Sequence, residues 1–70
     1  RQLQSREQAQ ALLDALAALP AVQREAFLLQ AEGALTVADI AATTGVPVET
    51  AKSRLRYARA TLRQTLEGFL

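Results

Sequence analysis

The sequence predicts an all-α fold, a small four-helix domain whose last two helices form a C-terminal helix-turn-helix. Three observations lead to this prediction. Half of the 70 residues are hydrophobic but only 4% are aromatic, so the core must consist mainly of Leu, Val, Ile and Ala, a composition that suits packed helices. Apolar residues recur at intervals of three and four along most of the chain. The few prolines and glycines divide these periodic stretches into separate segments.

The first helix is expected from about Arg6 to Ala18, because leucines recur at helical spacing from Leu12 onward. Residues 1–5 are polar and show no pattern, so we interpret them as the tail of an interdomain linker that precedes a domain covering residues 6–70. The absence of any Met predicts that the chain is a piece of a longer protein. Pro20 then ends the first helix or begins the second.

The second and third helices are predicted from their ends. A broad apolar face runs from Val22 to about Glu32 and predicts the second helix, with Gly33 as its C-terminal cap. Thr36 followed by Asp39 resembles a capping box, in which a hydroxyl accepts a hydrogen bond from the third backbone N–H of the helix. This pair therefore predicts the start of a short third helix.

The third helix is expected to bury Ile40 and Ala41 and to end at Gly45, because glycine accepts the left-handed backbone that a sharp turn requires. The last helix is predicted from about Val48 to Glu67, the longest stretch of helical pattern without an internal proline or glycine. Its apolar residues recur at steps of four, three, four and four and form the predicted core seam, which comprises Ala51, Leu55, Ala58, Leu62 and Leu66.

The net charge of +1 hides an asymmetry along the chain. Residues 1–45 carry three arginines against five carboxylates, which leaves a net charge of minus two. Residues 46–70 carry five basic residues against two glutamates, which leaves plus three. The C-terminal third is therefore expected to face a polyanion.

A polar, basic patch is predicted on the first two turns of the last helix, away from the core seam. A short helix, a glycine turn and a second helix with exposed cations form the arrangement that enters a DNA major groove. Guanine offers two acceptors there, so Lys52 and Arg56 have the chemistry to read it, and Ser53 can donate or accept. These three are the predicted base-reading residues. Backbone or supporting contacts are assigned to Thr36, Glu49, Thr50, Tyr57, Arg59 and Arg63.

Several of these residues have a second interpretation. The cationic stripe could be an ordinary solvated helix face, and only the preceding turn favours DNA. Arg59 and Arg63 meet either phosphates or another protein. Thr36 is a helix cap first and a phosphate contact second. Tyr57 stays open between stacking on a base and half-buried packing.

The composition argues against enzymes. The chain has no Cys and no His, so thiol chemistry and the commonest metal ligand and proton shuttle are missing, and no serine has a histidine to activate it. We expect no catalytic residue, metal, cofactor or small-molecule substrate. No stretch suits a membrane span or a signal peptide, so a cytoplasmic location is expected.

Several stretches together resemble region 4, the C-terminal domain that recognises the minus-35 promoter element, of extracytoplasmic-function sigma factors of the sigma-70 family. They are Leu19-Pro20, Arg24-Glu25, Leu35 to Ala41 and above all Gly45 to Leu55, which reads GVPVETAKSRL. The resemblance covers nearly the whole chain. It implies a four-helix domain that binds promoter DNA through a recognition helix starting near Val48.

The resemblance also implies roles for individual residues and partners. Lys52, Ser53 and Arg56 occupy the base-contacting positions of the motif. Its structural positions are Ile40, Ala41, Gly45, Ala51 and Leu55. The implied protein partners are core RNA polymerase, through the flap of its β subunit, and an anti-sigma factor that masks the same domain.

Two positions depart from the family pattern, and two other classes of protein stay open. Ala51 stands where the family usually has a larger Val or Ile, and Tyr57 stands where a basic residue is common. The first alternative is the helix-turn-helix output domain of a LuxR-type response regulator, which would dimerise and bind a two-fold symmetric site. The second is a helical protein-interaction module, whose basic stripe would face an acidic partner.

Overall fold

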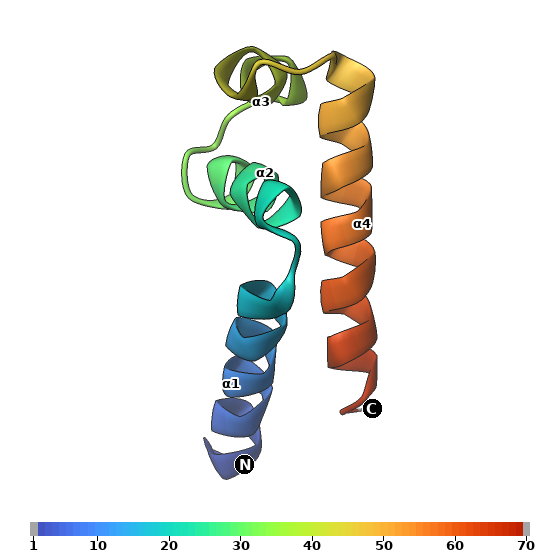
Figure 1. Cartoon of the computed structure of the whole chain (residues 1–70). Helices are drawn as coiled ribbons and strands as arrows, with labels where there is room; N and C mark the ends of the chain where they lie inside the picture. The colour runs from blue at the N-terminus through green and yellow to red at the C-terminus, as the bar shows by residue number, and fades with distance from the viewer. Residues whose placement is uncertain (1, 70) are drawn as a thin grey trace.

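The expected all-α fold is confirmed by the computed structural model, which describes the backbone of residues 2–69 and the side chains of residues 5–69. Within this part of the chain there are four helices and no strands (Figure 1). The helices are α1 (Gln2–Ala18), α2 (Ala21–Ala31), α3 (Val37–Thr44) and α4 (Val48–Glu67).

Helix α4 is the central element of the domain, because it contacts each of the other three helices. The domain is elongated, with principal extents of 41 × 19 × 17 Å. Helix α1 lies beside the C-terminal half of α4, and α2 and α3 lie beside its N-terminal half (Figure 1). The packing therefore places the turn between α3 and α4 at the end of the molecule opposite the start of α1.

Helix α1 begins at Gln2, so the expected start near Arg6 is wrong by four residues. The segment before Arg6 contains Gln and Leu, which are good helix formers, and neither Pro nor Gly interrupts it. A polar stretch without an apolar stripe can therefore still be helical. That residues 1–5 form the tail of an interdomain linker stays a prediction.

The junction between α1 and α2 is fixed by an arginine. Pro20 is the N-cap of α2, which confirms that it begins the second helix. The Arg24 guanidinium donates to the backbone oxygens of Ala17 at 3.0 Å and Leu19 at 3.1 Å. These hydrogen bonds satisfy carbonyl groups that the end of α1 leaves without a partner, so Arg24 ties α2 to α1.

The end of α2 differs from the prediction, because Gly33 is not its left-handed cap. The C-cap is Glu32, and the positive φ of 54° falls on Ala34. The amides of Gly33 and Leu35 both donate to the Leu29 oxygen, at 3.1 and 3.4 Å. A Cβ on Gly33 would lie 2.7 Å from that oxygen, so glycine is needed here for close approach and not for left-handed backbone.

Helix α3 has both predicted ends. The amide of Asp39 donates to Thr36 Oγ1 at 3.1 Å, so Thr36 is the N-cap. Gly45 has φ 70° and forms the left-handed C-cap. The Thr44 hydroxyl donates to the Ile40 oxygen at 2.7 Å and satisfies one further carbonyl of the last turn.

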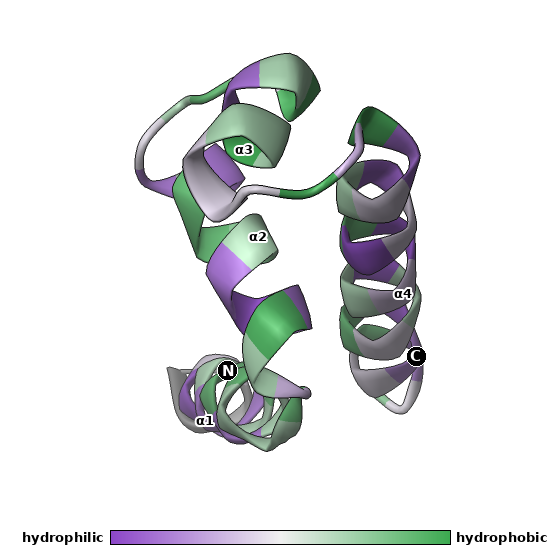
Figure 2. Cartoon of the chain, turned by 45° about the horizontal axis from the view of Figure 1, so that its top comes forward, coloured by the Kyte–Doolittle hydropathy of each residue, from purple (hydrophilic) through white to green (hydrophobic). Residues whose placement is uncertain are grey.

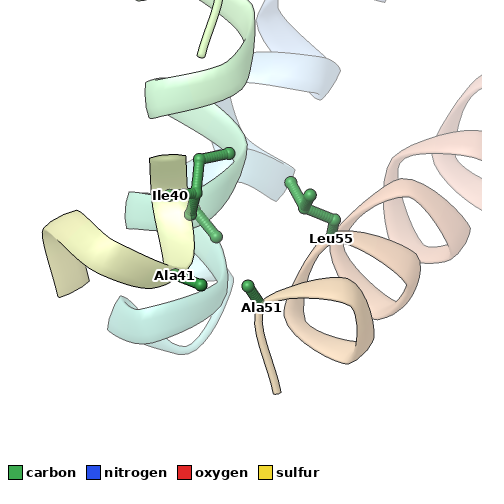
Figure 3. Close-up of a cluster of buried hydrophobic side chains, with 5 residues drawn as sticks. Ile40, Ala41, Ala51 and Leu55 are labelled. Atoms are coloured by element: carbon green, nitrogen blue, oxygen red, sulfur yellow. The ribbon is translucent and has the colours of Figure 1, made fainter. Parts of the chain in front are cut away.

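The buried core lies where α2, α3 and α4 meet. Ile40 and Leu55 are its largest fully buried side chains (Figure 3). The core cluster comprises Ala26, Ile40, Ala41, Ala51 and Leu55. The predicted seam of α4 is buried at Ala51, Leu55 and Ala58 but not at Leu66, which is 43% exposed. Leu66 stays exposed because this end of α4 extends beyond α2 and α3, so that only α1 lies beside it.

Candidate nucleic-acid interface

The corner between α3 and α4 is held by backbone hydrogen bonds. The amide of Val46 donates to the Ala41 oxygen at 3.0 Å, and that of Gly45 donates to the Ala42 oxygen at 3.3 Å. Pro47 is the N-cap of α4, and its oxygen accepts from the amide of Ala51 at 3.1 Å. The chain thus leaves one helix and enters the next within three residues, which fixes the direction of α4.

Packing across this corner fixes how α4 lies against α3. Ala41 and Ala51 point toward one another between the two helices, with Ile40 and Leu55 beside them (Figure 3). All four side chains are at most 4% exposed. The predicted structural residues of the helix-turn-helix are therefore brought together. Ala51 is completely buried, so a small residue here permits close approach of the helices and does not leave the site open.

The predicted base-reading residues lie on the outer side of the first turns of α4. Lys52 and Arg56 are exposed, and Ser53 is half-buried. Lys52 Nζ lies 3.6 Å from Glu49 Oε1, and the two side chains are 56% and 85% exposed. An exposed ion pair of this kind contributes little to stability. The Lys52 ammonium can therefore leave Glu49 and bind an acceptor on DNA instead.

Arg56 has two neighbours on its own helix. Its Nη2 lies 3.4 Å from Ser53 Oγ, and its Cζ lies 5.3 Å from the centre of the Tyr57 ring. Tyr57 is 55% exposed, so it is not the half-buried packing residue that was one of its two interpretations. The distance to the Tyr57 ring lies within the range of a cation–π contact. Hydrophilic residues recur along α4 between hydrophobic ones (Figure 2).

A basic groove runs along α4 on the side that faces the start of α3. Its four cations recur at steps of four, three and four and so form one stripe of the helix. The groove has a volume of about 380 Å³, and its lining comprises Val37, Lys52, Leu55, Arg56, Arg59, Ala60 and Arg63. The structure thus joins the predicted base-reading cations to the predicted backbone-contacting ones in one continuous surface.

The other supporting residues lie at the edges of this surface. Thr36 is exposed and its oxygen is used as the cap of α3, which confirms its first interpretation. Thr50 is half-buried on the first turn of α4. Arg59 donates from Nη2 to Gln30 Oε1 of α2, a partner that the sequence pattern did not single out.

A second groove, of about 630 Å³, lies between α1 and α4. It is mainly apolar, and two arginines of the basic groove also line it. The lining comprises Ala9, Leu12, Leu13, Leu16, Phe27, Leu62 and Leu66, with Arg59 and Arg63. Leu62 and Leu66 of this lining belong to the predicted core seam of α4, and Leu12, Leu13 and Leu16 lie on α1. Leu13, at 59% exposed, shows that α1 and α4 do not close over them.

Two further features are absent from the described part of the chain. It holds no group of acidic, His or Cys side chains that could bind a metal ion. None of its helices combines the length and apolarity needed to cross a bilayer.

A family model described as Sigma-70, region 4 matches residues 9–62, which include α2, α3, the corner and most of α4. A search of curated proteins finds no match.

Proposed function

Because the chain belongs to the sigma-70 region 4 family, we propose that it binds the minus-35 element of promoters in a sequence-specific way during bacterial transcription initiation. The observation that carries the proposal is the exposure of Lys52 and Arg56, with the half-buried Ser53 beside them, on the first turns of α4, directly after a corner that backbone hydrogen bonds hold. The proposed place of action is the cytoplasm, where promoter DNA is transcribed.

In the proposed complex, the N-terminal turns of α4 enter the major groove. Lys52 and Arg56 donate hydrogen bonds to the O6 and N7 acceptors of guanines, and Ser53 donates or accepts beside them. Arg59 and Arg63 lie farther along the helix and contact phosphates, which orients the domain without reading sequence. The run from Gly45 to Leu55 supports the finer assignment to an extracytoplasmic-function sigma factor.

The apolar groove between α1 and α4 is the proposed surface for core RNA polymerase, through the flap of its β subunit. The groove leaves the base-reading turns of α4 free, so both partners can bind at once. Arg59 and Arg63 lie at the edge that this groove shares with the basic groove, and the proposal assigns both to phosphates of the DNA. An anti-sigma factor is the further proposed partner, and it would compete with polymerase for this groove.

The test is selection of duplexes from a randomised pool by the parent chain and by two variants. Lys52→Ala and Arg56→Ala are each expected to cost about 1 to 3 kcal/mol on the selected duplex and to relax preference at distinct base pairs. Arg6→Ala removes an exposed cation of α1 and serves as the charge-matched control. Parent-like sequence preference in both variants would refute the assignment of readers.

The same selection separates the alternatives. A sigma-type domain selects one unsymmetric element, whereas a dimeric LuxR-type output domain selects two half-sites related by a two-fold axis. A protein-interaction module selects no sequence at all. Enrichment of a palindrome, or of nothing, therefore contradicts the proposal.

A further inference from the structure

A glutamine of α2 holds one of the cations of α4. Gln30 follows Ala26 by one helical turn, and Ala26 is 1% exposed in the core, so both lie on the side of α2 that packs against α4. Gln30 is half-buried, and its Oε1 accepts a hydrogen bond from Arg59 Nη2. The contact thus joins two helices that are separated by 29 positions in the sequence.

The contact matters because Arg59 lines both grooves of the domain. An arginine side chain has many rotamers, and ordering it costs free energy. A guanidinium at the boundary between an apolar and a basic groove could turn toward either one. An acceptor on α2 reduces this freedom before any ligand binds.

The acceptor is also neutral. A carboxylate at position 30 would hold the guanidinium more strongly but would cancel its charge. The Gln30 amide uses one of the five N–H donors of Arg59 and leaves the others, with the full positive charge, available to an anion. A neutral acceptor therefore orients the cation without neutralising it.

We propose that Gln30 is a positioning residue for DNA binding, which holds the Arg59 guanidinium ready to contact a phosphate of the duplex. The inference rests on the proposed binding of duplex DNA by α4 but not on sequence reading. Phosphate contacts carry no sequence information, so the test uses a short duplex of arbitrary sequence.

The experiment measures duplex affinity by fluorescence anisotropy over a range of salt concentrations. Each phosphate contact contributes about 0.9 to the slope of log affinity against log salt. Arg59→Ala and Gln30→Glu are both expected to lower this slope by one contact, the first by removing the charge and the second by pairing it. Gln30→Ala keeps the charge and is expected to lower affinity about threefold through lost positioning.

The other glutamine of α2 provides matched controls. Gln23→Glu adds the same charge as Gln30→Glu, and Gln23→Ala makes the same truncation as Gln30→Ala. Neither control is expected to change the slope by a full contact. In an Arg59→Ala background, Gln30→Ala is expected to cause no further loss. Thermal unfolding of each variant separates this effect from a general loss of stability.

Three outcomes would overturn the inference. Equal slopes for Gln23→Glu and Gln30→Glu would mean that the salt dependence responds to the net charge of the domain and not to pairing with Arg59. Additive losses in the Gln30→Ala, Arg59→Ala double variant would mean that Gln30 acts without Arg59. A parent chain that binds no duplex at low salt would remove this inference together with the proposed function. Loss of sequence preference in Lys52→Ala, in contrast, bears on the proposed function alone and leaves the expected slopes unchanged.

Discussion

Ala41 of α3 and Ala51 of α4 face one another across the corner of the helix-turn-helix, 4% and 0% exposed (Figure 3). Neither side chain extends beyond Cβ, so the two helices pack closely at the point where the chain changes direction. The orientation of the first turns of α4 depends on this contact, because Lys52 and Ser53 follow Ala51 directly.

Enlarging Ala51 is therefore expected to destabilise the domain. Ala51→Leu adds three carbon atoms to a completely buried position and is expected to cost about 1 to 3 kcal/mol through overpacking. Urea unfolding followed by circular dichroism measures the change. Ala38→Leu, on the exposed side of α3, is the control and should stay close to the parent. Equal stability of Ala51→Leu and the parent would show that the corner has room.

Two left-handed positions are expected to respond in opposite ways to exchange of Ala and Gly. Gly45 has φ 70° with open space where a Cβ would lie, so Gly45→Ala should cost about 1 kcal/mol through backbone strain alone. Ala34 already carries that strain at φ 54°, so Ala34→Gly should stabilise by about 0.5 kcal/mol. Thermal unfolding of both variants checks the pair, and a loss of stability in Ala34→Gly would contradict it.

Thr36 is expected to act on stability more than on DNA sequence preference. Thr36→Ala removes the acceptor of the Asp39 amide and should cost about 1 kcal/mol. Thr36→Ser keeps the oxygen and should stay near the parent. Urea unfolding gives the stability, and the duplex selection gives the preference. A changed preference in Thr36→Ala at unchanged stability would assign this residue to base reading instead of capping.

The apolar groove is expected to serve polymerase and not DNA. Leu13→Asp places a charge at a 59% exposed groove position, so it should weaken binding to core RNA polymerase much more than it weakens binding to the selected duplex. Val22→Asp, at a 45% exposed position outside the groove lining, is the control. Pull-down with core polymerase and duplex anisotropy measure the two activities. Parent-like polymerase binding by Leu13→Asp would leave the groove without its proposed partner.

Local chemistry explains which features the sequence predicted. Thr36 and Gly45 specify helix ends through one hydrogen bond and one backbone conformation, so both can be recognised without tertiary contacts. The helical period of α4 predicted Ala51 and Leu55 as buried and Lys52 and Arg56 as exposed. This works because a regular helix fixes the directions of its side chains around the axis relative to one another.

Features that depend on the relative placement of helices could not be predicted in the same way. Leu66 continues the apolar period of α4 but lies beyond the reach of α2 and α3, so it is exposed. The Gln30 to Arg59 contact joins distant positions and has no local signal. The left-handed residue after α2 is Ala34 and not the predicted Gly33, in a loop where the Leu29 carbonyl accepts the amides of Gly33 and Leu35.

The central claim is that the first turns of α4 enter the major groove, and amide and side-chain NMR of the chain titrated with its selected duplex tests it most directly. The largest shift changes are expected from Val48 to Tyr57, with intermolecular contacts from Ser53 and Arg56 to major-groove base protons. Shift changes confined to α1 and α2, with Lys52 and Arg56 unaffected at saturation, would contradict the claim.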